Sequence, residues 1–382
     1  MKFKRLNRQS RAIKKEIGKK IFEVLESSTF IQGPNVKKLE QELANFVGVD
    51  ECITCANGTD ALILAIKALN IQKNDVVFVP DFTFVASAEA IVLANAIPVF
   101  VDVDIKTMTM DPKDLEEKIN EVQATMIYHP KAIVTVDLFG NVCDYESIKK
   151  IAKRYDLPII EDAAQAFGSE YKGKKAGSIG TIGTTSFFPA KNVGCYGDGG
   201  AVFTNDLAIA KKIRSIANHG REDESFHYSR IGMNSRLDEL QAAILRVKLE
   251  HFKEVEIARI KENENKFMKI KYAIQKEQLN CMIVRSQFTI CCKTQQERLA
   301  LQKRFDKEDI PTMIYYQMPL SEQKAFQIFS HLFTKKKGDS NTKKLCQRVL
   351  SIPFDAYLHE DEIKKIKRIL RINLYFNENE KI

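Results

Sequence analysis

Between residues 51 and 205 the chain alternates short apolar runs with longer segments whose apolar residues recur at helical spacing. Several short runs are apolar throughout, as in parallel strands that helices cover on both faces. The expected strands are 76–80, 98–103, 132–139, 157–161, 184–188 and 201–204, and the expected helices are 59–69, 87–96, 112–120, 145–155 and 207–218. This alternation predicts a three-layer α/β domain.

After Asn234 the pattern changes. Residues 237–261 contain neither Pro nor Gly and are rich in Leu, Glu, Lys and Ala, which predicts a long helix. Strands are expected at 282–292 and 312–316, and helices at 295–306 and 361–370. We therefore expect a large α/β domain of residues 1–240, including an N-terminal helical segment, and a smaller α+β domain of residues 241–382 that begins with the long helix.

The net charge of +9 comes almost entirely from one segment. Residues 1–20 hold nine Lys or Arg against Glu16 alone, a net charge of +8. Ile13, Ile17 and Ile21 recur there at helical spacing, so the segment is expected to be a helix with an apolar stripe and a basic face. That basic face is either simply solvated or attracts a phosphorylated ligand or an anionic surface. No nucleic-acid partner is expected, because the rest of the chain is close to neutral. A second basic cluster, at residues 335–338, is expected to form a surface loop.

Composition and cysteine spacing further limit the class of protein to which the chain can belong. With 44% hydrophobic and 29% charged residues it has the composition of a soluble globular protein, and no apolar stretch approaches the roughly 20 residues that span a bilayer. The basic N-terminus lacks the apolar core of a secretory signal, so a cytoplasmic protein is expected. Cys52 and Cys55 form a C-x-x-C, which is either a redox pair, half a zinc site or two small buried residues beside a turn. No second half-site completes it, so no metal is expected.

Lys191 and Asp162 most directly suggest chemistry. Asp162 follows the apolar run 157–161, and Lys191 follows the expected strand 184–188, just before a glycine-rich segment that permits tight turns. A lysine amine can hold an aldehyde cofactor as an imine, and a carboxylate can keep a pyridine nitrogen protonated so that the ring accepts electrons. Ligands of open α/β sheets bind beyond the carboxyl ends of the strands, where both residues are expected. The pair predicts a pyridoxal-phosphate (PLP) enzyme.

Gly58 and Thr59 open the first helix of the α/β domain. Backbone N–H groups and the helix dipole favour a phosphate at such a position, although Asn-Gly-Thr-Asp is also a common helix-start turn. The glycine-rich segment 194–200 is not a P-loop, because it lacks the G-x-x-x-x-G-K-[ST] pattern and leads into a strand.

Two aromatic residues and a glutamine complete the expected site. Phe82 and Phe84 follow the strand 76–80, and such a ring either lies flat on a pyridine ring or packs in the core. Gln165 lies three residues after Asp162 and could reach the ring hydroxyl oxygen of the cofactor.

Five motifs, in this order, resemble those of the DegT-type nucleotide-sugar aminotransferases. They are CANGTDAL at 55–62, EDAAQ at 161–165, SFFP at 186–189 with Lys191, GDGG at 197–200 and NSRLD at 234–238. The resemblance covers the chain from about residue 30 onward and is especially close to the WbpE-like branch. It implies a fold-type-I PLP enzyme with a mostly parallel seven-stranded sheet. It also implies transfer of the amino group of L-glutamate to C3 of UDP-2-acetamido-2-deoxy-3-oxo-D-glucuronate, for bacterial surface glycan (O-antigen) synthesis.

The resemblance also implies a role for each site residue. Lys191 would bind PLP and move protons, Asp162 would pair with the ring nitrogen, and Phe84 would stack on the ring. Gln165 would contact the ring oxygen. Ser186, with backbone groups of Gly58 and Thr59, would hold the phosphate. A homodimer is implied, in which Asn234 of the neighbouring subunit reaches the same phosphate and Arg236, also across the interface, pairs with a substrate carboxylate.

Tyr315 marks a departure from the family pattern. Many members carry a histidine there that lines the sugar pocket, so other sugars remain open: UDP-3-keto-N-acetylglucosamine, a dTDP-3-keto-6-deoxyhexose or a 4-keto sugar. A histidine in place of Lys191 would have indicated a sugar dehydratase. An alternative from another class is a DNA-binding regulator on a degenerate PLP fold, suggested by the basic N-terminal segment.

Overall fold

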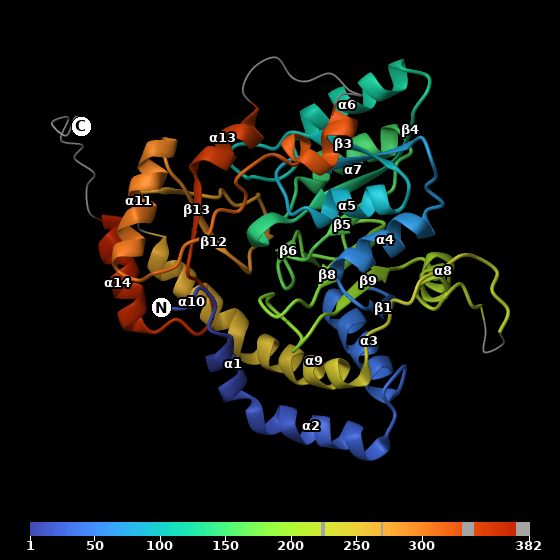
Figure 1. The fold of residues 1–382 in the computed structure, drawn as a ribbon, viewed down its shortest axis with the longest axis horizontal. Coiled ribbons are helices and arrows are strands. Elements are labelled where there is room, and N and C mark those ends of the chain that lie inside the picture. Colours follow the sequence, from blue (N-terminus) through green and yellow to red (C-terminus); the bar gives the residue numbers. More distant parts are fainter. Residues whose placement is uncertain (223–225, 269, 331–339, 372–382) are drawn as a thin grey trace.

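The computed structural model describes residues 1–222, 226–268, 270–330 and 340–371, and at its centre lies a seven-stranded sheet (Figure 1). In sheet order the strands are β1 (Glu51–Cys55), β9 (Gly200–Thr204), β8 (Ile182–Ser186), β5 (Ile159–Asp162), β4 (His129–Val136), β2 (Asp75–Pro80) and β3 (Ile97–Val101). Strand β9 runs antiparallel to both of its neighbours, and the other six strands share one direction. The predicted mostly parallel sheet is therefore confirmed.

Helices cover both faces of this sheet. On one face α4 (Gly58–Ala68), α5 (Ala86–Leu93) and α8 (Leu207–Ala217) pack around a shared apolar core. On the other face α6 (Pro112–Ala124) and α7 (Tyr145–Arg154) bury Leu115 and Ile148 completely. Because both faces are covered, every residue of β2 is buried, which explains why this strand is a continuous apolar run in the sequence.

The C-terminal part contains a second, smaller sheet. Its antiparallel strands are β10 (Ala273–Ile274), β12 (Phe288–Cys291) and β13 (Val349–Ile352), and α11 (Gln295–Lys307), α13 (Asn341–Arg348) and α14 (Glu360–Arg371) lie beside them. A third sheet joins β11 (Cys281–Met282) to β6 (Glu170–Tyr171) and β7 (Lys174–Lys175). Short 3₁₀ helices lie at Leu138–Gly140, Leu320–Glu322 and Lys324–Phe326, the last followed by α12 (Gln327–Ser330).

The long helix links the two parts of the molecule. It consists of α9 (Glu239–His251), a π-helical turn (Phe252–Glu256) and α10 (Ile257–Phe267), so it extends beyond the expected end at residue 261. Asp238 caps its start by accepting a hydrogen bond from the N–H of Gln241 (2.8 Å). Whether the domain boundary lies at residue 240 stays a prediction.

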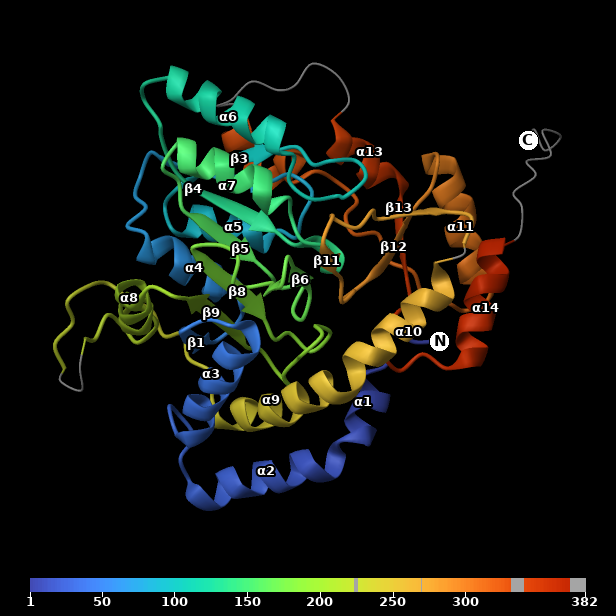
Figure 2. The ribbon, with the colours of Figure 1, turned by 180° about the vertical axis from the view of Figure 1, so that it is seen from behind.

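Two N-terminal helices precede α3 (Pro34–Val47). They are α1 (Leu6–Ala12) and α2 (Lys14–Ser27), and α2 lies alongside α9, as both ribbon views show (Figures 1 and 2). Ile13 and Ile17 are buried against Ile244 of α9. The expected apolar stripe is therefore a packing surface, with the basic side chains around it.

Three expectations need correction, and a fourth concerns residues that the structure does not describe. Residues 312–316 form no strand, because a single bridge between Met313 and Ser351 is their only pairing among the described residues. The run 282–292 is divided between β11 and β12. Cys52 and Cys55 lie within strand β1, which the sequence did not indicate, rather than beside a turn. The expected basic loop at 335–338 lies outside the described residues.

Candidate active site

Asp162 is the last residue of β5 and lies at the carboxyl edge of the central sheet. Its buried carboxylate accepts hydrogen bonds from the Ser87 hydroxyl (3.0 Å) and from the N–H of Ala164 (3.1 Å). Burial raises the pKa of Asp162 above its usual range, while these hydrogen bonds and the charge of Lys191 oppose that rise. A carboxylate buried in this way is stabilised by a cationic partner, and a protonated ring nitrogen is a suitable one.

The neighbouring Glu161 fixes the end of β5. Its side chain points to the opposite face of the strand, where it accepts hydrogen bonds from the N–H groups of Gly177 (2.5 Å), Ile179 (2.7 Å) and Gly180 (2.8 Å). Because these three bonds tie one face of the strand end to a loop, the direction of the Asp162 side chain is fixed on the other face.

Lys191 lies in a tight loop that follows β8. Its N–H donates to the carbonyl oxygen of Phe188 (2.9 Å). The loop depends on Gly194, because a Cβ atom there would come within 2.6 Å of the carbonyl oxygens of Phe188 and Pro189. The backbone conformation around Lys191 is therefore dictated by a close approach that only glycine permits.

Asn192 anchors this loop to the rest of the molecule. Its side-chain amide donates to the carbonyl oxygens of Phe167 (3.1 Å) and Val284 (3.3 Å). The neighbouring Lys191 side chain is partly buried, and burial lowers the pKa of its amine while the negative charge of Asp162 acts in the opposite direction. Each of the two groups shifts the pKa of the other, so the structure brings Lys191 and Asp162 together.

Gly58 and Ser186 meet at the same edge of the sheet. A Cβ atom on Gly58 would lie 2.6 Å from the Ser186 Cβ and 3.0 Å from its hydroxyl oxygen. Gly58 is the first residue of α4, and its N-cap Asn57 accepts a hydrogen bond from the N–H of Asp60 (2.8 Å). Thr59 follows, half-buried, in the first turn. A helix N-terminus with an adjacent hydroxyl is a setting suited to a phosphate group.

Phe84 is an exposed aromatic residue in the loop between β2 and α5. It exposes 53% of its surface, its carbonyl oxygen accepts a hydrogen bond from the N–H of Ser87 (3.2 Å), and its ring centroid lies 6.4 Å from that of Tyr316. Phe82, in contrast, is buried and packs edge-on against Phe139 and Tyr316. Core packing therefore describes Phe82, whereas Phe84 is free to contact a ligand ring.

Gln165 connects the aromatic residues to the end of β5. Its amide oxygen accepts a hydrogen bond from the N–H of Phe139 (3.1 Å), and its amide nitrogen donates to the Tyr316 hydroxyl (3.0 Å). Half-buried Tyr315 lies beside Tyr316, with ring centroids 5.7 Å apart, and contacts Phe3 edge-on at 6.2 Å. The structure thus places Tyr315 at the rim of the group formed by Lys191, Asp162, Gln165 and Phe84.

Asn234 and Arg236 do not join this group within the chain. Asn234 is exposed and forms an isolated bridge with Asn218, whose side-chain oxygen accepts a hydrogen bond from Arg236 (3.3 Å). Arg236 lines a different cavity, of about 320 Å³, together with Arg214 and Glu40. Their role across a subunit interface stays a prediction.

Ser87 and Tyr316 were not predicted from the sequence as residues of the site. Ser87 binds the Asp162 carboxylate from the first turn of α5, and nothing in the local sequence distinguishes it from other helix serines. Tyr316 could have been identified from the sequence, because it is next to Tyr315 in the motif that lines the expected sugar pocket.

Other classes of site have little support in the described part of the chain. No group of three or more His, Cys, Asp or Glu side chains there is arranged to hold a metal ion, and all eight cysteines are free thiols. None of the described helices combines the length and apolar character needed to cross a membrane.

Known proteins resemble this chain over almost its whole length. The family model of the DegT/DnrJ/EryC1/StrS aminotransferases matches residues 11–371. The chain is 41% identical to the UDP-2-acetamido-2-deoxy-3-oxo-D-glucuronate aminotransferase of Pseudomonas aeruginosa, over 94% of this chain and 97% of that protein. It is 39% identical to a pleiotropic regulatory protein of Geobacillus stearothermophilus, over 96% of this chain and 97% of that one.

A solved structure gives the same answer for the fold. S. venezuelae DesV, crystallised in complex with a ketimine intermediate, matches with a TM-score of 0.88 and 29% sequence identity over 97% of each chain. The predicted resemblance is confirmed: the chain belongs to the DegT/DnrJ/EryC1/StrS aminotransferase family.

Proposed function

We propose that the protein is a PLP-dependent aminotransferase that moves the amino group of L-glutamate to C3 of UDP-2-acetamido-2-deoxy-3-oxo-D-glucuronate. The observation that carries this proposal is the position of Lys191 beside Asp162 at the carboxyl edge of the sheet. The choice of sugar is supported by the name of the P. aeruginosa relative, which matches almost the whole chain.

The residues at this edge fit PLP. Asp162 would hold a proton on the ring nitrogen, Phe84 would cover one face of the ring, and Gln165 lies where a ring oxygen could be contacted. The Ser186 hydroxyl and the N–H groups of Gly58 and Thr59 would bind the phosphate. When bound, PLP supplies the electron sink that amino-group transfer requires.

Lys191 would act on protons through its Nζ atom. A lysine amine must be neutral to take a proton from carbon, and burial in this loop favours the neutral form. The opposing charge of Asp162 keeps the amine basic enough to bind that proton and then return it. One amine can therefore serve as base and acid in turn at the same position.

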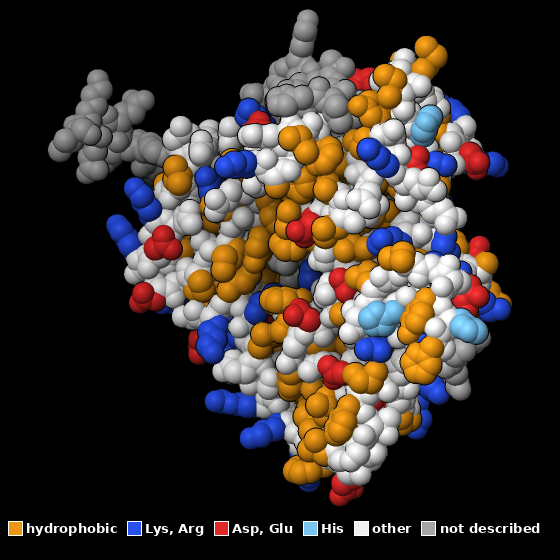
Figure 3. Space-filling view, turned by 45° about the vertical axis from the view of Figure 1, so that its right-hand side comes forward, with side chains coloured by type: hydrophobic (Ala, Val, Ile, Leu, Met, Phe, Trp, Pro, Cys, Tyr) orange, Lys and Arg blue, Asp and Glu red, His pale blue; other side chains and the backbone are white. Residues whose placement is uncertain are grey.

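The proposal includes a homodimer in the cytoplasm. Asn234 and Arg236 of one subunit would complete the site of the other, because neither reaches Lys191 within its own chain. Phe188, Phe226 and Ile231 expose large apolar areas, and apolar side chains are frequent on the face that Figure 3 shows. The eight free thiols are in keeping with a reducing compartment.

The test is coupled turnover with L-glutamate and two UDP-3-keto sugars, one with a carboxylate and one with a hydroxymethyl group at C5. Amination of the carboxylate sugar at C3 is expected, with release of 2-oxoglutarate. Exclusive use of the hydroxymethyl sugar would support the alternative UDP-3-keto-N-acetylglucosamine, and turnover of neither sugar would point to a dTDP-linked or 4-keto substrate.

A DNA-binding regulator is a second candidate, favoured by the name of the Geobacillus relative. The structure weakens its main support, the basic N-terminal segment. Two of its nine basic residues, Arg5 and Arg8, form ion pairs with Asp355 and Glu362, whereas Arg11, Lys14, Lys15 and Lys19 are exposed. The regulator would bind DNA with an affinity that falls steeply as the salt concentration rises, whereas the aminotransferase would not bind DNA.

A further inference from the structure

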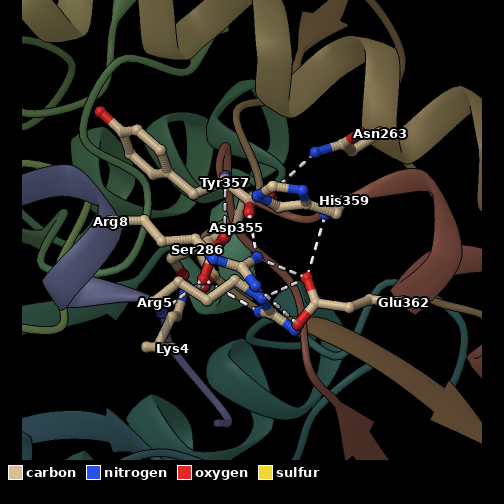
Figure 4. Close-up of polar contacts among 9 residues, drawn as sticks. All are labelled: Lys4, Arg5, Arg8, Asn263, Ser286, Asp355, Tyr357, His359 and Glu362. Carbon is tan, nitrogen blue, oxygen red and sulfur yellow. Dashed lines mark hydrogen bonds and ion pairs between the residues drawn. The ribbon is translucent and has the colours of Figure 1, made fainter. Parts of the chain in front are cut away.

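The first residues of the chain are anchored to its C-terminal part. The Arg5 N–H and guanidinium group donate to the carboxylate of Asp355 (2.8 and 3.1 Å). Arg5 Nε (3.1 Å) and Arg8 (2.5 Å) donate to Glu362, so that both guanidinium groups converge on this one carboxylate (Figure 4). The Met1 amino group donates to the carbonyl oxygen of Asp309 (3.0 Å). These contacts fix residues 1–8 along the C-terminal part.

This anchored segment carries Phe3 and Lys4 to the candidate active site. Lys4 Nζ donates to the carbonyl oxygen of Ser286 (2.5 Å), and the Ser286 N–H donates to the carbonyl oxygen of Phe139 (3.3 Å). The N–H of Phe139 in turn binds Gln165. Lys4 and Lys191 line one small cavity of about 40 Å³, and the charge of Lys191 affects the pKa of Lys4.

Lys4 is partly buried, and no carboxylate among the described residues accepts a hydrogen bond from its amine. Burial lowers the pKa of its amine to about 8, so the amine is still protonated at pH 7. Its one hydrogen-bond acceptor among the described residues is the neutral Ser286 carbonyl, although an ammonium group has three N–H donors.

The two nearest carboxylates are already engaged by other residues. Asp355 binds Arg5, and Glu256 accepts hydrogen bonds from Gln9 (2.9 Å) and from the Tyr357 hydroxyl (2.7 Å). Both still act on Lys4 through space, in opposition to the nearby cationic groups of Arg5 and Lys191. A partly buried ammonium group with unused donors gains from an additional anionic acceptor, so a carboxylate ligand at this position would be bound favourably.

We propose that Lys4 binds a carboxylate group of a substrate at the edge of the active site. The inference rests on the proposed function, because that reaction involves two carboxylate-bearing substrates, L-glutamate and the uronate sugar. Phe3 supports the assignment, since its ring packs against Tyr315 at the rim of the site and holds this end of the segment there. Lys4 is therefore assigned as a residue that determines specificity for acidic substrates, rather than as a tether of the N-terminus alone.

The test measures ligand binding to the holoenzyme by calorimetry. UDP-2-acetamido-2-deoxy-D-glucuronate and UDP-N-acetylglucosamine differ only in a carboxylate against a hydroxymethyl group, and glutarate represents the dicarboxylate donor. The wild type is expected to prefer the uronate, and Lys4→Met should weaken binding of one carboxylate ligand by roughly 10–100-fold, the value for a lost charge-assisted hydrogen bond. Lys4→Arg should retain part of the preference.

The two sets of measurements, one with the pair of nucleotide sugars and one with glutarate, identify which substrate supplies the carboxylate that Lys4 binds. Loss of the uronate preference alone assigns Lys4 to the sugar, and weaker glutarate binding alone assigns it to the amino donor. UDP-N-acetylglucosamine should bind Lys4→Met as it binds the wild type. Lys2→Met is the matched control, because Lys2 is exposed two residues away and should change neither set of measurements.

Two results would overturn the inference. One is unchanged affinity of Lys4→Met for both carboxylate ligands. The other is an equal loss of affinity for charged and neutral ligands together with a fall in Tm, because that pattern belongs to a structural tether. If the wild-type protein does not transaminate at all, the proposed function is wrong. The ratio of the affinities for the uronate and for UDP-N-acetylglucosamine is measured without turnover, so it distinguishes a failure of the inference from a failure of the proposed function.

Discussion

Gly58 lies so close to Ser186 that a Cβ atom on the glycine would come within 2.6 Å of the serine Cβ. This contact sets the first turn of α4 directly against the end of β8, where the proposed phosphate site lies. Gly58→Ala should therefore push the two elements apart and lower PLP affinity at least about 10-fold, with an overpacking cost of about 1–3 kcal/mol. Equilibrium binding of PLP to the apoenzyme measures the first effect, and urea unfolding measures the second.

Gly18→Ala is the control for this substitution. Gly18 lies within α2, and nothing is within 4 Å of where its Cβ would be. Alanine there should leave PLP affinity unchanged and stabilise the protein by about 0.5–1 kcal/mol. Equal PLP affinity of Gly58→Ala and the wild type would show that the phosphate binds elsewhere.

Asp162→Asn should abolish most amino transfer without unfolding the protein. An asparagine can keep the hydrogen bonds to Ser87 and Ala164, but it cannot hold a proton on a ring nitrogen. The rate of the glutamate half-reaction, followed by stopped-flow absorbance, should fall at least about 100-fold. The free energy of unfolding should change by less than about 1 kcal/mol. Glu117→Gln, on the exposed surface of α6, should change neither quantity, and a nearly normal rate in Asp162→Asn would refute the assigned role.

The anchor at Glu362 should weaken in acid. Burial favours the protonated form, but the hydrogen bonds from Arg8 and the His359 N–H, with the charges of Arg5 and Arg8, prevail and lower the pKa of Glu362 to about 2. Since the folded pKa lies below the unfolded value of 4.5, the stabilisation is complete above pH 4.5 and is lost as the pH falls towards 2.

Urea unfolding at several pH values checks this linkage. Glu362→Gln should lower the free energy of unfolding by about 1–2 kcal/mol at pH 7, a figure discounted for solvent screening, and the difference from wild type should shrink below pH 4.5. Asp361→Asn is the control, because the Asp361 side chain is almost fully exposed. A difference that stays constant down to pH 3 would contradict the assigned pKa.

A mixed dimer tests the proposal that Asn234 serves the neighbouring subunit. Lys191→Ala and Asn234→Ala should each be inactive alone, because each lacks one component of every site. After co-refolding, half of the dimers are hybrids in which one of two sites is intact, so activity should recover to about a quarter of the wild type. No recovery, with hybrid dimers demonstrated by native mass spectrometry, would place both residues in the same subunit's site.

Local patterns explain what the sequence could predict. The apolar run before Asp162, the motif around Lys191 and the helix start at Gly58 are all short-range signals, and each marks the end or beginning of an element at one sheet edge. The carboxyl ends of parallel strands lie at that edge of the sheet, regardless of the sequence elsewhere in the chain. The fold class and the central residues of the site followed from this rule.

Other features depend on contacts that no local pattern encodes. Residues 312–316 are rich in strand-forming side chains, yet tertiary packing places Tyr315 and Tyr316 in a loop at the site, and β1 was missed because Glu51–Cys55 mixes polar with apolar residues. Lys4 lies 282 positions before Ser286 in the sequence, so nothing nearby marks it as part of the site. Asn234 and Arg236 have a predicted role that requires a second subunit.

The most direct measurement locates the cofactor attachment. The purified protein, incubated with PLP and reduced with borohydride, is digested and mapped by mass spectrometry. A pyridoxyl adduct on Lys191, absent from Lys191→Ala, is the predicted result, because the amine of Lys191 lies close enough to Asp162 for each charge to act on the other. A stoichiometric adduct on any other lysine, or no adduct in protein that transaminates, would contradict the account.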